Sequence, residues 1–193
     1  MENIILKRFK ESGEVKNRFL KENLPRIVEV IKLVAQGFEG GSKLFLFGNG
    51  GSAADAQHIA AEFVNRFIID RPPLPAIALT TDTSILTSIS NDVAFNEVFS
   101  KQLKALGKEG DIAIGISTSG NSPNILKAFE VAKEIGIKTV AFTGNEGGGI
   151  AKVADISLIV PSSSTPRIQE THILMGHILC EMVEHQLFFK VDS

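Results

Sequence analysis

The chain has 193 residues, a length typical of one domain, and 44% of them are hydrophobic, enough to bury a core. Its net charge of −2 and its lack of Trp and Tyr argue against a basic, base-stacking surface for nucleic acid. With Cys180 as the single cysteine, no disulfide can form within the chain, and no apolar run is long enough for a membrane span. Composition therefore predicts a cytoplasmic protein that binds neither nucleic acid nor membrane.

The first forty residues are predicted to be helical. Apolar side chains recur at helical spacing between charged residues over 2–20 and again over 24–38. Pro25 suits the first turn of a helix, so we expect one or two helical segments over 2–20 and a further helix over 24–38. A minimal α/β unit does not need these helices, which suggests that residues 1–39 are used in oligomerisation.

The stretch 48–62, GNGGSAADAQHIAAE, is predicted to lead from a strand into a helix. The preceding apolar run, 43–47, suits a buried strand. Glycines at 50 and 51 permit a tight turn, and Ser52 is a favourable N-cap for the helix that follows. Free backbone N–H groups and the helix dipole at such a turn favour an anion.

One helical turn further on, His58 and Glu62 are spaced i, i+4, about 40° apart around the helix. An imidazole and a carboxylate on one helix face can share a metal ion or pass a proton. Pairs with this spacing are usually only surface contacts. Here the pair directly follows the glycine turn, which favours a functional interpretation.

Four further apolar runs are predicted as strands, at 75–80, 111–117, 138–143 and 155–160. Helices are predicted from Pro123 to Ile135, ending at Gly136, and from 165 to about 189, and 81–99 is predicted as two short helices or a helix and a loop. Almost wholly apolar strands that alternate with helices are typical of a parallel sheet covered on both faces. We therefore predict an α/β fold with a five-stranded parallel sheet in a three-layer αβα sandwich, with residues 43–189 as its core and 1–193 as a single domain.

The segment 117–122, STSGNS, is a second candidate anion site at the end of a predicted strand. Its four hydroxyl groups and turn amides lie where Pro123 begins a helix, and such groups hydrogen-bond phosphate oxygens. In the simpler alternative, Ser122 only caps the helix and the other hydroxyls decorate a turn. The chain lacks both the Walker A lysine pattern and G-x-G-x-x-G, so a small phosphorylated ligand fits better than a nucleotide.

The last predicted helix carries Gln169 and His177, about 80° apart around its axis, whereas His172 falls elsewhere on the circumference. If this helix meets the earlier one, Gln169 and His177 together with His58 and Glu62 can close one N/O metal site, which suits zinc or a similar divalent ion. In the alternative interpretation, these histidines are partly buried helix residues without a role.

These motifs resemble those of the phosphoheptose isomerases, the sedoheptulose 7-phosphate isomerases of the sugar-isomerase (SIS) domain superfamily. The resemblance covers nearly the whole chain. It is carried by residues 48–62, Asn91-Asp92, residues 117–122 and Arg167-Ile-Gln-Glu170 with His177. The serine-rich turn is common to many SIS domains, whereas the full set with His58, Glu62, Gln169 and His177 is much more specific.

The resemblance implies site residues, a cofactor and an assembly. One zinc ion per subunit would be held by His58, Glu62, Gln169 and His177, and the protein would be a homotetramer with active sites at subunit interfaces. The small phosphorylated sugar would contact a larger set, with Ser52 a plausible addition: Asn49, Gly50, Gly51, Glu62, Asn91, Asp92, Ser117, Thr118, Ser119, Ser122 and Gln169.

The implied reaction moves a carbonyl group between C2 and C1 of sedoheptulose 7-phosphate. Its product, D-glycero-D-manno-heptose 7-phosphate, is a heptose precursor of bacterial surface polysaccharides such as lipopolysaccharide. The reaction requires removal of a proton beside a carbonyl through an enediol-like intermediate. We expect Glu62 to be the base that moves this proton, and His177 to be the partner acid or base at the oxygens.

Two other functions remain open at this point. The chain is also compatible with a non-catalytic SIS-domain regulator that binds the bacterial replication initiator DnaA, because close relatives of the isomerases include such a protein. It is also compatible with an isomerase for another sugar phosphate, such as a pentose phosphate. The complete set of His58, Glu62 and His177 favours an enzyme over the regulator.

Overall fold

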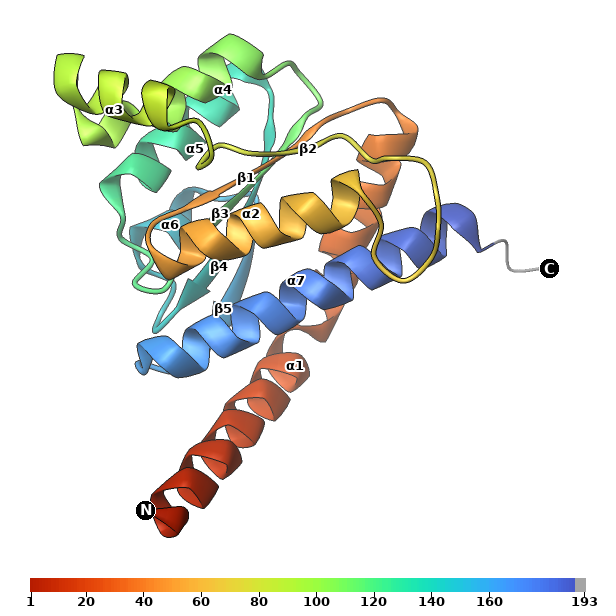
Figure 1. Ribbon diagram of the computed structural model, residues 1–193, viewed down its shortest axis with the longest axis vertical. Helices are drawn as coiled ribbons and strands as arrows, with labels where there is room; N and C mark the ends of the chain where they lie inside the picture. Colours follow the sequence, from red (N-terminus) through yellow and green to blue (C-terminus); the bar gives the residue numbers. More distant parts are fainter. Residues whose placement is uncertain (190–193) are drawn as a thin grey trace.

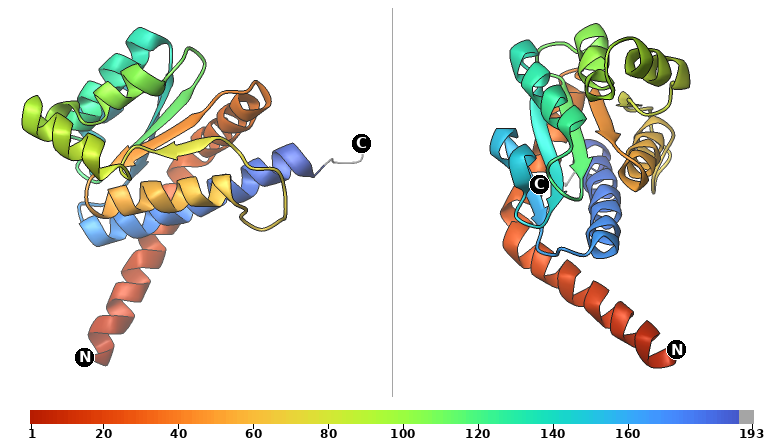
Figure 2. Two further views of the ribbon diagram at one scale, coloured as in Figure 1. Left: turned by 45° about the horizontal axis from the view of Figure 1, so that its top comes forward. Right: turned by 90° about the vertical axis from the view of Figure 1, so that its left-hand side faces the viewer.

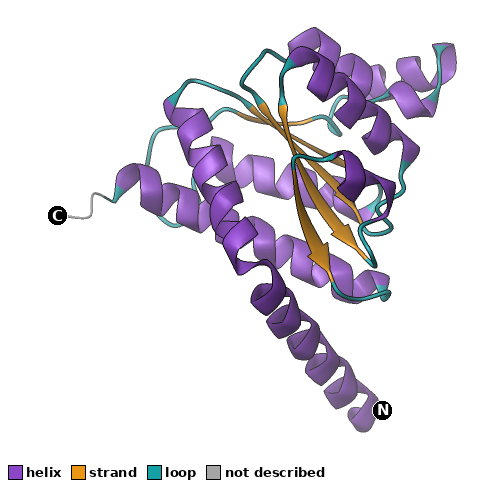
Figure 3. Ribbon diagram, turned by 180° about the vertical axis from the view of Figure 1, so that it is seen from behind, coloured by secondary structure: helices purple, strands orange, loops and turns teal. Residues whose placement is uncertain are grey.

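A computed structural model describes residues 1–189 of the chain, and its centre is a five-stranded sheet (Figure 1). Every neighbouring pair of strands is parallel, in the order β2-β1-β3-β4-β5. All five predicted strands are confirmed, with these bounds: β1 (Leu44–Gly48), β2 (Ala76–Ala78), β3 (Ile112–Ser117), β4 (Lys138–Gly144) and β5 (Ile156–Val160). The strands run in one direction, so their carboxyl ends meet at a single edge of the sheet (Figure 3).

Helices cover both faces of the sheet, so the predicted three-layer αβα sandwich is confirmed (Figure 2). One face is covered by α1 (Glu2–Glu39), α2 (Gly51–Val64) and α7 (Thr165–Phe188). The other side carries α3 (Thr83–Asp92), the 3₁₀ helix η1 (Phe95–Glu97), α4 (Ser100–Leu106), α5 (Pro123–Ile135) and α6 (Gly148–Val153). None of these described helices is both long and apolar enough to cross a membrane.

Strand β1 shows how the sequence builds two cores from one strand. Leu44 and Leu46 point into the core beneath α1, α2 and α7, whereas Phe45 and Phe47 point into the core beneath α4 and α5. All four side chains are fully buried. Full burial of each side chain stabilises the fold by roughly 1.5–3 kcal/mol. Because β1 is covered on both faces, it does not show the alternation of polar and apolar residues that is seen in a strand with one exposed face.

The N-terminal region forms one continuous helix of 38 residues, α1, rather than the separate helices expected from the sequence. Pro25 lies inside this helix and on its exposed side, so the carbonyl of Lys21, which loses its usual partner, faces water. The buried stripe continues across the proline, from Phe19 to Ile27 and Val30. Packing of this stripe on the core outweighs the local cost of proline and keeps the helix intact.

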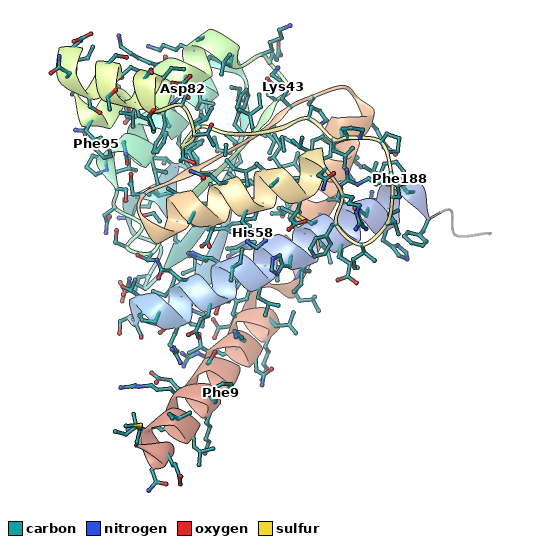
Figure 4. All side chains as sticks on the ribbon, in the orientation of Figure 1. Phe9, Lys43, His58, Asp82, Phe95 and Phe188 are labelled. Carbon is teal, nitrogen blue, oxygen red and sulfur yellow. The ribbon has the colours of Figure 1, made fainter. Side chains whose placement is uncertain are left out.

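The first third of α1 extends away from the body of the molecule (Figure 1). Its apolar side chains are exposed, and Phe9, labelled in Figure 4, is 78% exposed. Ile4 and Leu6 are 64% and 67% exposed. An amphipathic helix whose apolar side chains lie in water has the composition of an interface.

Helices α2 and α7 lie side by side and run in the same direction (Figures 1 and 2). They pack closely at Gly176, where an added Cβ would lie 2.5 Å from Cδ1 of the fully buried Ile59. Any side chain at 176 would have to displace the Ile59 side chain or push the two helices apart. This glycine therefore sets the distance between the two helices that carry the histidine and carboxylate candidates.

We predict that Gly176→Ala destabilises the protein by about 1–3 kcal/mol, because its methyl group overpacks against Ile59. The matched control is Gly13→Ala in α1, where an added Cβ has nothing within 4 Å. That variant should gain about 0.5–1 kcal/mol from helix propensity. Urea denaturation at one protein concentration measures both, and equal gains in the two variants would contradict the close approach.

Candidate active site

The two predicted anion-binding turns lie next to each other at the carboxyl edge of the sheet. The glycine turn follows β1, and the serine-rich turn follows β3, its neighbour in the sheet. Asn49 and Asn124 join them through reciprocal amide hydrogen bonds of 3.0 and 2.9 Å. Asn124 is buried, so this contact fixes the glycine turn to the first turn of α5.

Helix α2 begins two residues earlier than an N-cap at Ser52 would require. Gly50, with φ of 56°, occupies the N-cap position, and Gly51 is the first helical residue. The expected capping role of Ser52 is therefore wrong. Ser52 is buried inside the first turn, where its N–H donates to the Asn49 carbonyl at 3.0 Å. A glycine that accepts a positive φ lets the chain enter the helix directly from the turn.

Three of the four hydroxyl groups in the serine-rich turn gather around Ser117. Its Oγ lies 3.0 Å from Oγ of Ser122 and 3.5 Å from Oγ of Ser119. Ser122 is the N-cap residue of α5 by position, but its side chain makes no capping hydrogen bond. Thr118 contributes its carbonyl, which accepts a hydrogen bond from the Asn145 amide at 3.1 Å. The cluster of hydroxyls at a helix N-terminus suits an anionic ligand.

Asn91 and Asp92 lie at the exposed end of α3, the helix that follows β2. The Asn91 amide donates to the Asp92 carboxylate at 2.8 Å. The structure thus places this pair on the segment after the edge strand, in contact with each other. Their predicted contact with a sugar phosphate stays a prediction.

His58, Glu62 and His177 come together between α2 and α7, where Figure 4 labels His58. His58 Nε2 lies 3.1 Å from Glu62 Oε1 and 3.5 Å from His177 Nε2. The side chains of His58 and Glu62 are 47% and 26% exposed, so the group is open to a ligand. The two helices far apart in the chain therefore meet as the sequence suggested, and a carboxylate and two imidazoles share one small region.

Gln169 also faces α2, but at the other end of the contact. Its side-chain amide lies beside Gly51, where an added Cβ would be 2.5 Å from Nε2. Eight residues separate Gln169 from His177, about 12 Å along α7. In the part of the chain that the structure covers, no group of three or more His, Cys, Asp and Glu side chains is already arranged as a metal centre. The four-ligand zinc site stays a prediction.

Asp55 is a polar group at this site that the sequence reasoning missed. It precedes His58 by three residues on the same side of α2, and its Oδ2 is buried without a hydrogen-bond partner among the described residues. Burial raises the pKa of this carboxyl group, while the nearby His58 and His177 oppose the rise. The i, i+3, i+7 spacing of Asp55, His58 and Glu62 was the signal available in the sequence.

Arg71 and Glu184 form a buried ion pair beside the candidate site, which the sequence also did not reveal. Arg71 Nε donates to Glu184 Oε1 at 2.9 Å, and the two side chains are only 1% and 2% exposed. Burial raises the pKa of Glu184. Backbone N–H groups of residues 67–69 and the Arg71 side chain outweigh that effect and hold the pKa below its ordinary value. The Glu184 carboxyl group is therefore charged at neutral pH.

His172 lies on the opposite side of α7 from His177 and faces the sheet. It is buried, its Nε2 is 3.0 Å from the Thr143 carbonyl, and burial lowers its pKa to about 4. At neutral pH the ring is uncharged. Its place is in the core, in agreement with the view that it falls outside the site.

Sequence and structure comparisons identify the class of this protein. The SIS domain family model matches residues 9–144. The phosphoheptose isomerase of Thermodesulfovibrio yellowstonii is 56% identical over 97% of this chain and 94% of its own length.

Two solved structures agree with this relationship. The phosphoheptose isomerase of Neisseria gonorrhoeae is 44% identical, with a TM-score of 0.90 over 95% of this chain and 98% of its own. That of Francisella tularensis is 39% identical, with a TM-score of 0.91 over 95% and 97%. The chain belongs to the phosphoheptose isomerase family of SIS-domain proteins.

The ion pair predicts an acid-dependent loss of stability. Because the pKa of Glu184 is lowered by folding, its stabilising effect is complete above the ordinary glutamate pKa of about 4.3 and is lost as pH falls below that value. Glu184→Gln should cost about 3–5 kcal/mol near neutral pH, since it leaves Arg71 buried and unpaired.

Denaturation of the wild type and Glu184→Gln across pH 3–7 measures this dependence, and the difference between them should shrink toward the acid end. Glu181→Gln, an exposed position on the same helix, serves as the control and should change stability by less than about 0.5 kcal/mol. A difference independent of pH would contradict a charged Glu184.

Proposed function

We propose that the protein is an aldose–ketose isomerase that interconverts sedoheptulose 7-phosphate and D-glycero-D-manno-heptose 7-phosphate. The observation that carries this proposal is that His58 contacts both Glu62 and His177 and so brings the two catalytic candidates into one small region. It occurs in a chain whose relatives, at more than half identity, are named phosphoheptose isomerases. A cytoplasmic location fits the single, buried, unpaired Cys180.

In the proposed reaction, Glu62 moves one proton and no atom is added to the sugar. The Glu62 carboxylate removes a proton from C1 of the ketose, a C1–C2 double bond forms, and the carbonyl oxygen on C2 takes a proton. Glu62 then returns its proton to C2, while the hydroxyl on C1 loses its proton and becomes the new carbonyl. His177 serves the oxygens, as the acid toward O2 and the base toward O1.

The hydroxyl cluster is proposed to hold the phosphate. Ser117, Ser119 and Ser122 donate hydrogen bonds, and the N-terminus of α5 adds partial positive charge. Since the phosphate takes no part in the chemistry, this binding supplies energy and fixes C1 and C2 relative to the base. Asn49, Gly50 and Gly51, which are tied to this turn through Asn124, are proposed to line the same end of the sugar.

The positions of these groups support active sites shared between subunits of a homotetramer. Within one chain, Glu62 lies eleven residues beyond Gly51, about 17 Å along α2. A seven-carbon sugar phosphate held at the turns does not reach that far. A second copy that presents its own Glu62 and His177 to these turns completes the site, and the exposed apolar side chains of α1 offer a surface for such assembly.

Zinc is proposed as the cofactor because the donor types suit it. Two imidazoles and a carboxylate are preferred zinc ligands. The contacts of 3.1 and 3.5 Å around His58 Nε2 are close to the separation of about 3.3 Å between two ligands bound tetrahedrally at 2.0–2.1 Å. His58, Glu62 and His177 would hold the ion, whereas Gln169, the further predicted ligand, lies beside Gly51 at the other end of the α2–α7 contact in the same chain. When bound, zinc would polarise a sugar oxygen and stabilise negative charge.

We predict that Glu62→Gln folds and assembles normally but loses isomerisation by about 10²–10⁴-fold, since the amide cannot accept the proton from carbon. Conversion of ketose to aldose phosphate is the assay, with gel filtration as the check on assembly. Glu181→Gln on the exposed face of α7 is the control and should retain full turnover. Near-normal turnover in Glu62→Gln would remove Glu62 from the base role, and an inactive wild type would favour the non-catalytic regulator.

We predict that the purified wild type binds one zinc ion per subunit and that His177→Gln loses most of it, because an imidazole donor is removed. His185→Gln, on the exposed side of the same helix, is the matched control and should keep its zinc. Metal content after dialysis against a weak chelator measures both. Equal zinc retention in the two variants would contradict the proposed ligand set.

A further inference from the structure

We propose that Phe67 is a positioning residue for His177, fixed in place by the buried Arg71–Glu184 pair. Nothing in the sequence motifs assigns a role to these three residues. The proposal rests on the proposed function in one respect only, namely that His177 serves the reacting oxygens.

The imidazole of His177 contacts two other rings. The Phe67 ring stacks on it with a centroid distance of 5.6 Å and an interplanar angle of 28°. The His58 ring meets it edge-on at 5.0 Å and 73°. A ring stacked through its face keeps its nitrogen atoms at the free edge, so Phe67 restricts rotation of the imidazole without occupying Nε2.

Phe67 does not belong to a helix or a strand, and its position depends on the carboxylate of Glu184. The backbone N–H groups of Phe67, Ile68 and Ile69 donate to this carboxylate at 2.9, 3.0 and 3.4 Å. Glu184 lies seven residues after His177, two turns along α7 and nearly on the same side. The helix that carries His177 therefore also fixes the loop whose ring covers His177.

Arg71 extends this arrangement to the other catalytic candidate. While Nε pairs with Glu184, Nη2 donates to the Glu62 carbonyl at 2.8 Å and Nη1 donates to the Phe63 carbonyl at 2.6 Å. These carbonyls belong to the last turn of α2, which has no following turn to bond them. The same buried ion pair therefore fixes both the backbone of Glu62, through Arg71, and the position of Phe67, through Glu184.

The experiment compares Phe67→Leu, which keeps apolar bulk but removes the aromatic face, with Phe67→Tyr, which restores it. The matched control is Phe189→Leu. The Phe189 ring stacks on His185 with a centroid distance of 5.2 Å and an interplanar angle of 18°, and this pair lies at the end of α7, away from the site. Each protein is measured as the purified, zinc-supplemented full chain. The readouts are kcat and KM for isomerisation and the NMR resonances of the His177 ring protons, assigned by comparison with His177→Gln.

We expect Phe67→Leu to lower kcat by about tenfold or more with KM changed less than about twofold, since misplacing a reacting group by about 1 Å has large effects on rate. The His177 ring protons should shift and broaden as they lose the stacked ring. Phe67→Tyr should restore both readouts, and Phe189→Leu should change neither.

Wild-type kcat and unshifted His177 resonances in Phe67→Leu would overturn the proposal, as would a Phe67→Tyr variant as slow as Phe67→Leu. The NMR readout does not depend on turnover. If the wild type proves inactive on the heptose phosphate, the proposed function fails, whereas the placement of His177 by Phe67 is still decided by whether the His177 ring-proton resonances broaden in Phe67→Leu.

Discussion

The close packing of α2 on α7 is the constraint on which the rest of the candidate site depends. Because Gly176 has no side chain, α7 approaches the fully buried Ile59 of α2, and the two helices run in the same direction at short range. Their alignment sets two contacts at once: Gln169 lies beside Gly51, and His177 lies beside His58. A shift of α7 by a single residue would turn every side chain by about 100° and move His177 out of reach. The register of this one helix pair therefore decides which polar groups lie close together.

Apart from that contact, the buried ion pair of Arg71 and Glu184 fixes an irregular loop and the end of α2, which regular secondary structure does not hold in place. A buried ion pair is often no more stabilising than well-packed apolar residues of the same size, so stability alone does not account for Arg71 and Glu184. Their hydrogen bonds explain them better. Glu184 accepts from three consecutive backbone N–H groups of an irregular loop, and Arg71 donates to two carbonyls at the end of α2. An apolar pair would remove the hydrogen-bond partner of the Glu62 carbonyl and of the three loop N–H groups, and each such group costs about 1–3 kcal/mol when it is buried and unsatisfied.

Apolar runs predicted the five strands, α5 and α7, because burial on both faces of a parallel sheet leaves an unambiguous pattern in the sequence. Local rules were less reliable where tertiary packing opposed them. Pro25 indicated a helix boundary, yet the buried stripe of α1 continues past it, and Gly50 rather than Ser52 begins α2. The motifs indicated His58, Glu62 and His177. They did not indicate Phe67, Arg71 or Glu184, because the partners of Glu184 lie 113 to 117 residues away in the chain and no spacing rule connects them.

Under the proposed function, the fold separates phosphate binding from proton transfer in space, so that assembly of subunits would be needed for catalysis. The proposed phosphate end would rely on neutral hydroxyls and backbone groups at the sheet edge, where a helix N-terminus and short turns can present them to an anion. The proton-transfer end relies on a carboxylate and imidazoles that must sit on a helix surface, partly exposed, between two helices. In one chain, α2 holds these two ends apart by about its own length. Under the proposed function, each subunit therefore contributes its phosphate-binding turns to one active site and its acid–base pair to another, so the two groups act on different sugar molecules. A dissociated subunit would keep both halves intact and still be unable to turn over substrate, because neither half meets its complement except across an interface.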